Sequence, residues 1–337
     1  MKRINPQLLL TVIVSFLAFS CEEKKMGANK ALPLVIAHRG ASGYLPEHSL
    51  EAKAYAHALG ANYLEQDIVL TKDNIPIIMH DPEIDTTTNV AEIFPRRIRE
   101  DGRYYSVDFT LKEIKSLKLR ERFDPKTGKP IYPNRFPLNE YNSRVPTLEE
   151  EIQFIQGLNK STGKNVGIYP EIKKPFWHKQ QGKDISRIVV EVLHKYGYKS
   201  KEDNIYLQIF DFEELKRIRE ELGYKGKLVM LIGENDWNEA PTDYEYIKSE
   251  EGMAEVAKYS DGIGPWIPQV IIDGKVTGLI SLAHKHKMEV HPYTVRIDAL
   301  PSHVKEANEL LNLLFNKAKV DGIFTDFPDV VLGFMRK

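Results

Sequence analysis

Short runs of apolar and β-branched residues alternate with helical patterns along this chain, and this alternation limits the fold more than any other feature. The expected strands are Leu32–Ala37, Tyr63–Val69, Val166–Ile172, Ile205–Ile209, Leu228–Leu231, Gly262–Gly264, Glu289–Thr294 and Gly322–Thr325. The helices expected between most of them are Ser49–Leu59, Leu148–Leu158, Ile185–Tyr196, Phe212–Leu222, Gly252–Lys258, Leu279–Lys287 and His303–Lys319. Because parallel strands are usually connected by helices, this order predicts an α/β fold, a (β/α)8 TIM barrel.

An open, doubly wound sheet is the competing architecture. Polar residues decide between the two, because they occur near the carboxyl ends of many different expected strands. These residues are His38, Glu65, Glu171, Gln208, Tyr293 and Asp326. Active sites of barrels are built at that end of the strands, whereas an open sheet would not gather residues from so many of them. We therefore favour the barrel, occupying residues 32–337 as one domain.

The stretch from Pro82 to Arg144 does not fit the alternation. It is too long for an ordinary connection between a strand and a helix. It contains aromatic residues and a short helical pattern near Leu111–Leu119. We interpret residues 82–144 as an inserted subdomain that folds over the barrel mouth and shapes substrate access. A purely structural cap is the alternative.

A hairpin is expected directly after the second strand. The run Ile75–Met79 follows it, and Asp73-Asn74 between them suits a two-residue turn. Side chains of a strand alternate between its faces, so Glu65 and Asp67 should share one face. A two-residue turn would also place Asp67 opposite His80, and a shift of register by one residue would break this pairing.

Four short motifs between His38 and Asp81 indicate a catalytic site. They are His38-Arg39-Gly40, Pro46-Glu47, Glu65-Gln66-Asp67 and His80-Asp81. Metal-assisted cleavage of a phosphodiester needs ion ligands, a phosphate clamp and a pair of proton-transfer groups, and these motifs supply all three. Each motif alone has an ordinary explanation, since Arg-Gly often forms a turn and His-Asp is common on surfaces. Their coincidence in one short stretch favours catalysis.

Three carboxylates, Glu65, Asp67 and Glu171, predict a site for a hard divalent cation. An all-oxygen set suits calcium or magnesium and argues against zinc, which prefers His or Cys. Coordination number and cavity rigidity separate the two ions, and neither follows from these residue types. For Glu171, a plain salt bridge with Lys173 at the end of the strand is the alternative.

Longer motifs extend this pattern over nearly the whole chain after Leu32. They are His38–Ser49, Glu65-Gln66-Asp67, His80-Asp81, Thr87–Ala91, Asp101–Tyr105, Tyr169–Lys173, His291–Arg296 and Phe324–Pro328. Together they resemble the glycerophosphodiester phosphodiesterase family, and in particular its bacterial periplasmic branch. The commoner family pattern has Asn-Thr after Pro46-Glu47. The His48-Ser49 found here is a variant associated with the periplasmic branch.

The resemblance implies hydrolysis of glycerophosphodiesters, such as glycerophosphocholine, to sn-glycerol 3-phosphate and an alcohol. It maps the metal ligands to Glu65, Asp67 and Glu171, and it favours Ca²⁺, with Mg²⁺ as the alternative. In the scheme it implies, His38 and His80 transfer protons. One removes the proton of the glycerol 2-hydroxyl, which attacks phosphorus to form a cyclic phosphate, and the other protonates the leaving alcohol. Which histidine acts first is left open.

Further residues are expected to contact the phosphate or the glycerol. Arg39 can hold phosphate oxygens through its planar fork of donors. Lys173, Gln208, Tyr293 and Arg296 lie at or near the ends of expected strands and are the other candidates. For Arg296, an ion pair with a nearby acid such as Asp298 is the alternative.

The beginning of the chain predicts export. Lys2 and Arg3 precede a twelve-residue apolar run, Leu8–Phe19, which is too short to span a bilayer but suits a signal peptide over residues 1–21. The only cysteine, Cys21, follows a sequence similar to a lipoprotein-processing site. Residues 22–31 would then be a polar tether. We expect a periplasmic or outer-membrane-associated protein, anchored by lipid at Cys21 and otherwise not in the membrane; a plain signal peptide is the alternative.

Charge and composition narrow the classes of ligand. With 47 basic and 48 acidic residues, the net charge is −1, so no basic field attracts nucleic acid. The expected partner is a small glycerophosphodiester, and no protein partner is indicated. Two alternative functions stay open at this point. One is cleavage of lysophospholipids, which needs an apolar groove; the other is a surface lipoprotein that uses the barrel only as a binding scaffold.

Overall fold

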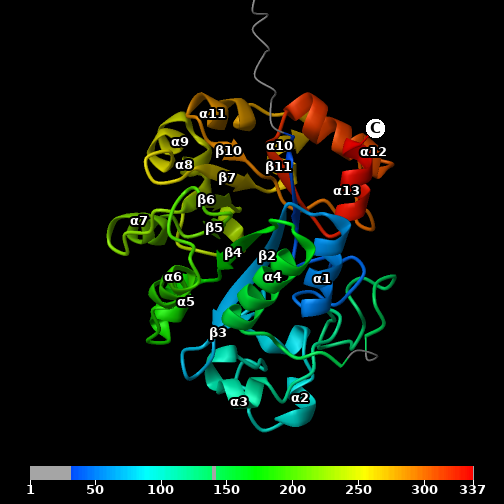
Figure 1. Cartoon of the computed structure of the whole chain (residues 1–337), viewed down its shortest axis with the longest axis vertical. Helices are drawn as coiled ribbons and strands as arrows, with labels where there is room; N and C mark the ends of the chain where they lie inside the picture. Colours follow the sequence, from blue (N-terminus) through cyan, green and yellow to red (C-terminus); the bar gives the residue numbers. More distant parts are fainter. Residues whose placement is uncertain (1–31, 139–141, 337) are drawn as a thin grey trace, which may run out of the picture. The chain divides into compact units, whose positions relative to one another are not determined.

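In a computed structural model, which describes residues 32–138 and 142–336, a barrel of parallel strands confirms the predicted fold (Figure 1). The strand order is β10-β7-β6-β5-β4-β2-β1-β11. The bounds are β1 (Leu34–Ala37), β2 (Tyr63–Leu70), β4 (Gly167–Ile172), β5 (Tyr206–Ile209), β6 (Lys227–Ile232), β7 (Gly262–Pro265), β10 (Glu289–Val290) and β11 (Gly322–Thr325). Every expected strand is therefore present, with ends shifted by a few residues.

The barrel closes where the chain after β10 runs beside β11. The strand expected over Glu289–Thr294 is regular only to Val290, because Pro292 has no backbone N–H to donate. Its carbonyl still accepts a hydrogen bond from the Phe324 N–H at 3.0 Å, and the Val295 N–H donates to the Phe324 carbonyl at 2.8 Å. These bonds join the two edge strands and bring their carboxyl ends to one rim.

Helices connect most of the strands, as Figure 1 shows. The longer ones are α1 (Leu50–Leu59), α4 (Leu148–Thr162), α6 (Ile185–Lys195), α7 (Phe212–Glu220), α9 (Glu250–Val256), α11 (Leu279–Lys285) and α13 (Pro328–Met335). The shorter elements are α5 (Pro175–Gln180), α8 (Tyr244–Lys248), α10 (Ile267–Val270), α12 (Ala307–Leu311), the π-helical turn η4 (Asn312–Ala318), the 3-10 turn η3 (Asn235–Trp237) and the hairpin β8 (Ile271–Ile272) with β9 (Lys275–Val276). The helix expected from His303 begins only at Ala307, because Glu306 before it has an extended backbone.

Local sequence explains where the helices begin and end. Ser49 caps α1 by accepting a hydrogen bond from the Ala52 N–H, and Gly60 ends the helix in the left-handed conformation, with φ of 98°. Thr147 and Glu150 form a reciprocal capping box at the start of α4. The outer faces of the strands and the inner faces of the helices bury the main apolar core between them.

Aromatic side chains fill the barrel interior. Tyr63, Tyr169, Tyr206 and Phe324 form a buried cluster there with Ile36 and Val229. The rings of Tyr169 and Tyr206 stack with centroids 5.0 Å apart. This packed interior makes the barrel a solid core, so a ligand is confined to the rim at the carboxyl ends of the strands.

Residues 82–138 build a small layer beside the hairpin of β2 and β3 (Pro76–Ile78). Its elements are η1 (Ile84–Thr86), α2 (Val90–Ile93), η2 (Ser106–Asp108) and α3 (Leu111–Ile114). The helix expected near Leu111–Leu119 is thus a single turn. The layer has its own apolar cluster, which includes Phe109 and packs on Ile77 and Met79 of the hairpin. In Figure 1, α2 and α3 lie just beyond β3.

The predicted signal peptide, Cys21 and the polar tether lie outside the described residues. Within residues 32–138 and 142–336, no helix has both the length and the apolar character needed to cross a membrane.

Candidate active site

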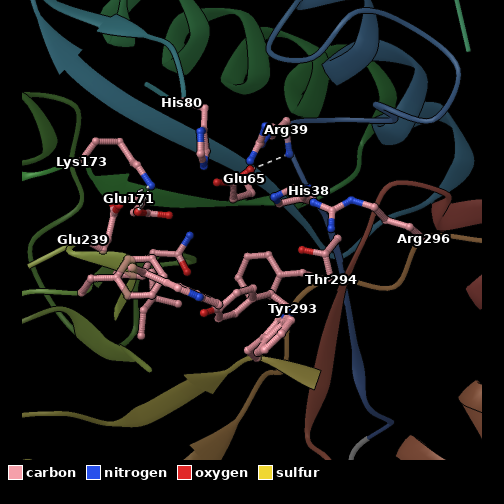
Figure 2. Close-up of a pocket in the computed structure, with 16 residues that line it drawn as sticks. His38, Arg39, Glu65, His80, Glu171, Lys173, Glu239, Tyr293, Thr294 and Arg296 are labelled. Carbon is pink, nitrogen blue, oxygen red and sulfur yellow. Dashed lines mark hydrogen bonds and ion pairs between the residues drawn. The ribbon is translucent and has the colours of Figure 1, made fainter. Parts of the chain in front are cut away.

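The loop after β1 places Arg39 against the second strand. Arg39 has φ of 57° and Gly40 has φ of 91°, so the chain turns sharply there. A Cβ at Gly40 would lie 2.8 Å from the Ala52 carbonyl carbon, which explains the glycine. The turn points the Arg39 backbone N–H at the carboxylate of Glu65, and the N to Oε2 distance is 2.5 Å (Figure 2).

The register of the parallel strands brings the predicted acids together. Asp67 of β2 pairs with Glu171 of β4, and Glu171 pairs with Gln208 of β5. These three residues therefore lie at one level of the barrel, and Glu65 lies one pleat below Asp67 on the same face of β2. All four are buried, with exposed fractions of 1% to 6%.

The predicted pairing of Asp67 with His80 is wrong by one residue. Asp67 lies opposite Met79, and the Met79 N–H donates to the Asp67 carbonyl at 2.9 Å. The loop has three residues because Thr71 closes it, and Asn74 adopts the left-handed conformation with φ of 61°. His80 therefore falls beyond the end of β3. Its side chain still points into the same space as Glu65 (Figure 2).

A cavity of about 290 Å³ opens at this rim of the barrel. All of the predicted site residues except Asp67 line it: His38, Arg39, Glu65, His80, Glu171, Lys173, Gln208, Tyr293 and Arg296. Its other walls include Phe210, Leu231, Trp237, Glu239, Trp266, Thr294 and Phe324. Chain segments from all around the barrel thus meet at one cavity, as the strand-end pattern predicted.

Each histidine of the cavity pairs with a carboxylate. His38 Nδ1 lies 2.6 Å from Asp326 Oδ1, and His80 Nδ1 lies 2.6 Å from Asp81 Oδ1. Burial, followed by the charge of Arg39, lowers the pKa of His38 to about 4. The same two causes lower the pKa of His80. Both imidazoles are therefore neutral near pH 7 and able to accept a proton.

Lys173 lies between two carboxylates. Its Nζ is 2.6 Å from Glu171 Oε1 and 3.3 Å from Glu239 Oε1. The salt bridge proposed as the alternative role of Glu171 is thus present, but inside the cavity. Burial, with the neighbouring Asp67 adding to it and Lys173 opposing, raises the pKa of Glu171 to about 8. Burial and Asp67 also raise the pKa of Glu65. This concentration of acid favours a bound cation.

His48 joins the acids, although the sequence motifs did not single it out as a ligand. One atom each of His48, Glu65 and Asp67 lie within 4.8 Å of one another, a group that could hold a metal ion. His48 Nε2 lies 2.7 Å from Asp67 Oδ2, and His48 Nδ1 lies 3.5 Å from the Lys53 ammonium. Because an ammonium only donates, His48 accepts at Nδ1 and donates from Nε2. This arrangement orients Asp67, whose buried Oδ1 has no hydrogen-bond partner.

The remaining predicted contacts have varied environments. Arg296 donates from Nε to Asp326 at 3.0 Å and does not form the alternative pair with Asp298. Tyr293 donates its hydroxyl to the Ile232 carbonyl at 2.8 Å. The side-chain oxygen of Gln208 is buried without a partner and faces the cavity. Gln208 is thus the member of this group most in need of a ligand.

Known proteins with similar sequences belong to one family. A sequence model of the "Glycerophosphoryl diester phosphodiesterase family" matches residues 38–330. A glycerophosphodiester phosphodiesterase of Haemophilus influenzae is 49% identical over 333 residues, with 91% of each chain covered. One of Treponema pallidum is 40% identical over 329 residues, covering 90% of this chain and 92% of the relative.

Solved structures share the fold. A phosphodiesterase of Oleispira antarctica, in complex with the product sn-glycerol-3-phosphate, superposes with a TM-score of 0.61 at 19% identity, covering 91% of this chain and 98% of that one. A glycerophosphodiester phosphodiesterase of Agrobacterium tumefaciens gives a TM-score of 0.59 at 17% identity, covering 90% and 100%. Both likenesses confirm the barrel architecture.

Proposed function

Because this chain belongs to the glycerophosphoryl diester phosphodiesterase family, we propose that it cleaves glycerophosphodiesters with two histidines and one divalent cation. The chain is a glycerophosphodiester phosphodiesterase. The proposed substrates are deacylated phospholipids such as glycerophosphocholine, and the products are sn-glycerol 3-phosphate and an alcohol. One observation carries the proposal: two neutral imidazoles, three cationic side chains and buried acids face one cavity.

The acids fit a hard divalent cation. Glu65, Asp67 and Glu171 supply carboxylate oxygens, and the buried Asp67 Oδ1 has no partner of its own. Burial disfavours charge on Glu65 and Glu171, so a cation would balance an arrangement that is otherwise costly. We propose these three as the ligands and His48 as the residue that orients Asp67, with Ca²⁺ preferred and Mg²⁺ the alternative. When bound, the ion would neutralise charge developing on the phosphate oxygens.

The protein's own groups account for binding and proton transfer. The guanidinium of Arg39 and the ammonium of Lys173 border the cavity and would attract the phosphate. One histidine accepts the proton of the glycerol 2-hydroxyl as its oxygen bonds to phosphorus. The other histidine first takes up a proton from solvent at its free ring nitrogen, and it donates this proton to the alcohol oxygen as the bond from that oxygen to phosphorus breaks. Water then opens the cyclic phosphate with the two roles exchanged.

The size of the cavity favours a small alcohol. About 290 Å³ is at the low end of the range for ligand pockets, which suits a glycerophosphodiester better than a lysophospholipid with an acyl chain. The buried acids argue against a pure binding scaffold, because a scaffold has no use for mutually repelling carboxylates. For the location, we propose export and lipid anchoring at Cys21, supported by the apolar run Leu8–Phe19 before it.

Release of glycerol 3-phosphate from glycerophosphocholine tests the function. The purified protein is assayed untreated, with EDTA, and after EDTA with Ca²⁺ or Mg²⁺ restored separately. We expect EDTA to abolish release and one of the ions to restore it preferentially. Release that is indifferent to EDTA would refute the metal-dependent mechanism. No release from folded protein with either ion would refute the proposed substrate.

A further inference from the structure

We propose that Arg122 and Arg135, both from residues 82–144, are positioning residues that hold the two histidines of the cavity through Asp81 and Asp326. The inference rests on the proposed function, in which those histidines transfer protons. It gives the 82–144 segment a part in catalysis beyond shaping access to the cavity.

The first chain of contacts runs from Arg122 to His80. Arg122 Nη1 donates to Asp81 Oδ2 at 2.8 Å, while the other oxygen of Asp81 lies 2.6 Å from His80 Nδ1. Because the two oxygens serve different partners, Asp81 cannot turn away from His80 without breaking the bond to Arg122. Arg122 also donates from Nε and Nη2 to Glu47, at 2.9 and 2.7 Å. Glu47 in turn accepts from Arg39 Nη1 at 3.0 Å, so Arg122 supports the phosphate-binding arginine as well.

The second chain repeats this design at His38. Arg135 Nη2 donates to Asp326 Oδ2 at 2.7 Å, while Asp326 Oδ1 lies 2.6 Å from His38 Nδ1. Arg135 is itself fixed, because its Nε donates to Asp298 at 2.8 Å and its guanidinium lies 3.7 Å from the ring centre of Tyr132. Its side chain is only 5% exposed.

An ionised carboxylate sets the state of its histidine. It only accepts hydrogen bonds, so the partner nitrogen Nδ1 must carry the hydrogen, and Nε2 keeps a free lone pair. Although burial would raise the pKa of Asp326, Arg296, His38 and Arg135 hold it well below the usual range. For Asp81, burial again opposes the change, but His80 and Arg122 hold the pKa well below its usual range. Both arginines therefore favour the carboxylate form that orients the imidazole.

The shared origin of the arginines makes this more than two separate contacts. Arg122 and Arg135 follow the part of the segment that packs on the β2–β3 hairpin through its own apolar cluster. Each bond crosses a long stretch of chain, 41 residues from Asp81 to Arg122 and 191 residues from Arg135 to Asp326. Folding of one segment thus orders both histidines at the same time.

The test compares Arg122→Gln and Arg135→Gln with Arg122→Lys, Arg135→Lys and a matched control, Arg103→Gln. Arg103 lies in the same segment and forms a two-bond pair with the buried Asp85, at 2.7 Å for each bond, but it contacts no partner of a histidine. Measurements are kcat and KM for glycerophosphocholine at saturating ion, the melting temperature, and the ¹⁵N shifts of the His38 and His80 rings.

We expect each Gln variant to lower kcat about 10- to 100-fold, the range found for residues that orient the ligands of a metal, with a smaller change in KM. The Lys variants should recover part of kcat, because they keep the charge but not the planar fork. The ¹⁵N shifts of the affected histidine should show a mixture of the two ring tautomers in place of the single one with hydrogen on Nδ1. Arg103→Gln should lower the melting temperature while kcat stays within about threefold of wild type.

Two double variants make the inference falsifiable even where a Gln variant folds poorly. If Arg135 acts through Asp326, Arg135→Lys combined with Asp326→Asn should lose no more kcat than Asp326→Asn alone. The same holds for the kcat of Arg122→Lys with Asp81→Asn, while any further loss through Glu47 and the phosphate-binding Arg39 should appear in KM. Additive losses, or wild-type kcat and ring shifts in folded Gln variants, would overturn the inference. An equal loss of kcat in Arg103→Gln would also overturn it, because the effect of the two arginines would then be one of general stability. If wild type itself releases no glycerol 3-phosphate, the proposed function fails instead.

Discussion

Lys53 and Glu151 form an ion pair behind the second strand in which neither side chain is exposed at all, with Nζ and Oε1 2.9 Å apart. The same ammonium donates to the Glu65 carbonyl and lies 3.5 Å from His48 Nδ1. A buried pair from α1 and α4 thus supports the strand that carries Glu65 and the histidine that orients Asp67.

Removing one member of this pair should be worse than removing both. We expect Lys53→Met to lower the free energy of unfolding by about 3–5 kcal/mol, because Glu151 would be left as an unpaired buried charge. The double variant with Glu151→Leu should recover much of that loss. Urea unfolding followed by circular dichroism measures both. A double variant that is as unstable as the single one would show that packing, not charge, controls this site.

Replacing either histidine of the cavity should slow turnover strongly without unfolding the protein. We expect His38→Ala and His80→Ala each to lower kcat by about 10²–10⁴, the usual range for a general acid or base. His284→Gln is the matched control, because His284 Nε2 lies 2.7 Å from Asp321 in a similar His–Asp pair that is not part of the cavity. Its kcat should equal that of wild type. A wild-type kcat for His38→Ala or His80→Ala would remove that residue from the mechanism.

Titration calorimetry with Ca²⁺ distinguishes the ligands from other acids of the cavity. Glu171→Gln should weaken ion binding at least about tenfold, the lower end of what residues near a metal contribute. Glu239→Gln should have a smaller effect, because Glu239 is not among the proposed ligands although it pairs with the same Lys173. If Glu239→Gln weakened binding more than Glu171→Gln, the ion would lie on the other side of Lys173.

Glu121 should make the protein less stable as pH rises. Burial, with the charge of Glu47 adding to it, raises its pKa from 4.5 to about 8. Between these values the folded protein keeps a proton that the unfolded chain has lost, so stability falls through this window and stays lower above it. Glu121→Gln should therefore be more stable than wild type by on the order of 2–4 kcal/mol at pH 9, and by little at pH 4. Equal differences at the two pH values would contradict this assignment.

We predict that Cys21 is the attachment point of a lipid anchor. We expect the full chain expressed in a bacterial host to partition into the detergent phase of Triton X-114 and to incorporate labelled palmitate. Cys21→Ser should shift the protein to the aqueous phase, because the thiol is the attachment point for lipid. Equal partitioning of both forms would favour a plain signal peptide.

The sequence by itself determined the strands, the barrel and most of the cavity lining. Strands such as Tyr63–Leu70 are recognisable because β-branched and apolar runs are a local property. Once the strands are parallel, polar residues at similar levels of neighbouring strands must lie close together, so Glu65, Glu171 and Gln208 could be grouped in advance.

Only the tertiary structure decided contacts that depend on one-residue register or on long-range chain paths. The turn at Asn74 shifted His80 away from Asp67, because the choice between a two- and a three-residue loop rests on small local energies. His48 and Glu239 carry no periodic signal that marks them as partners of Asp67 and Lys173. Arg122 and Arg135 reach Asp81 and Asp326 only in the folded protein, because these contacts span 41 and 191 residues of the sequence. A sequence pattern that repeats every two residues, or every three to four, reports only the geometry of one strand or helix. Contacts across the rim of a barrel join residues much farther apart in the sequence.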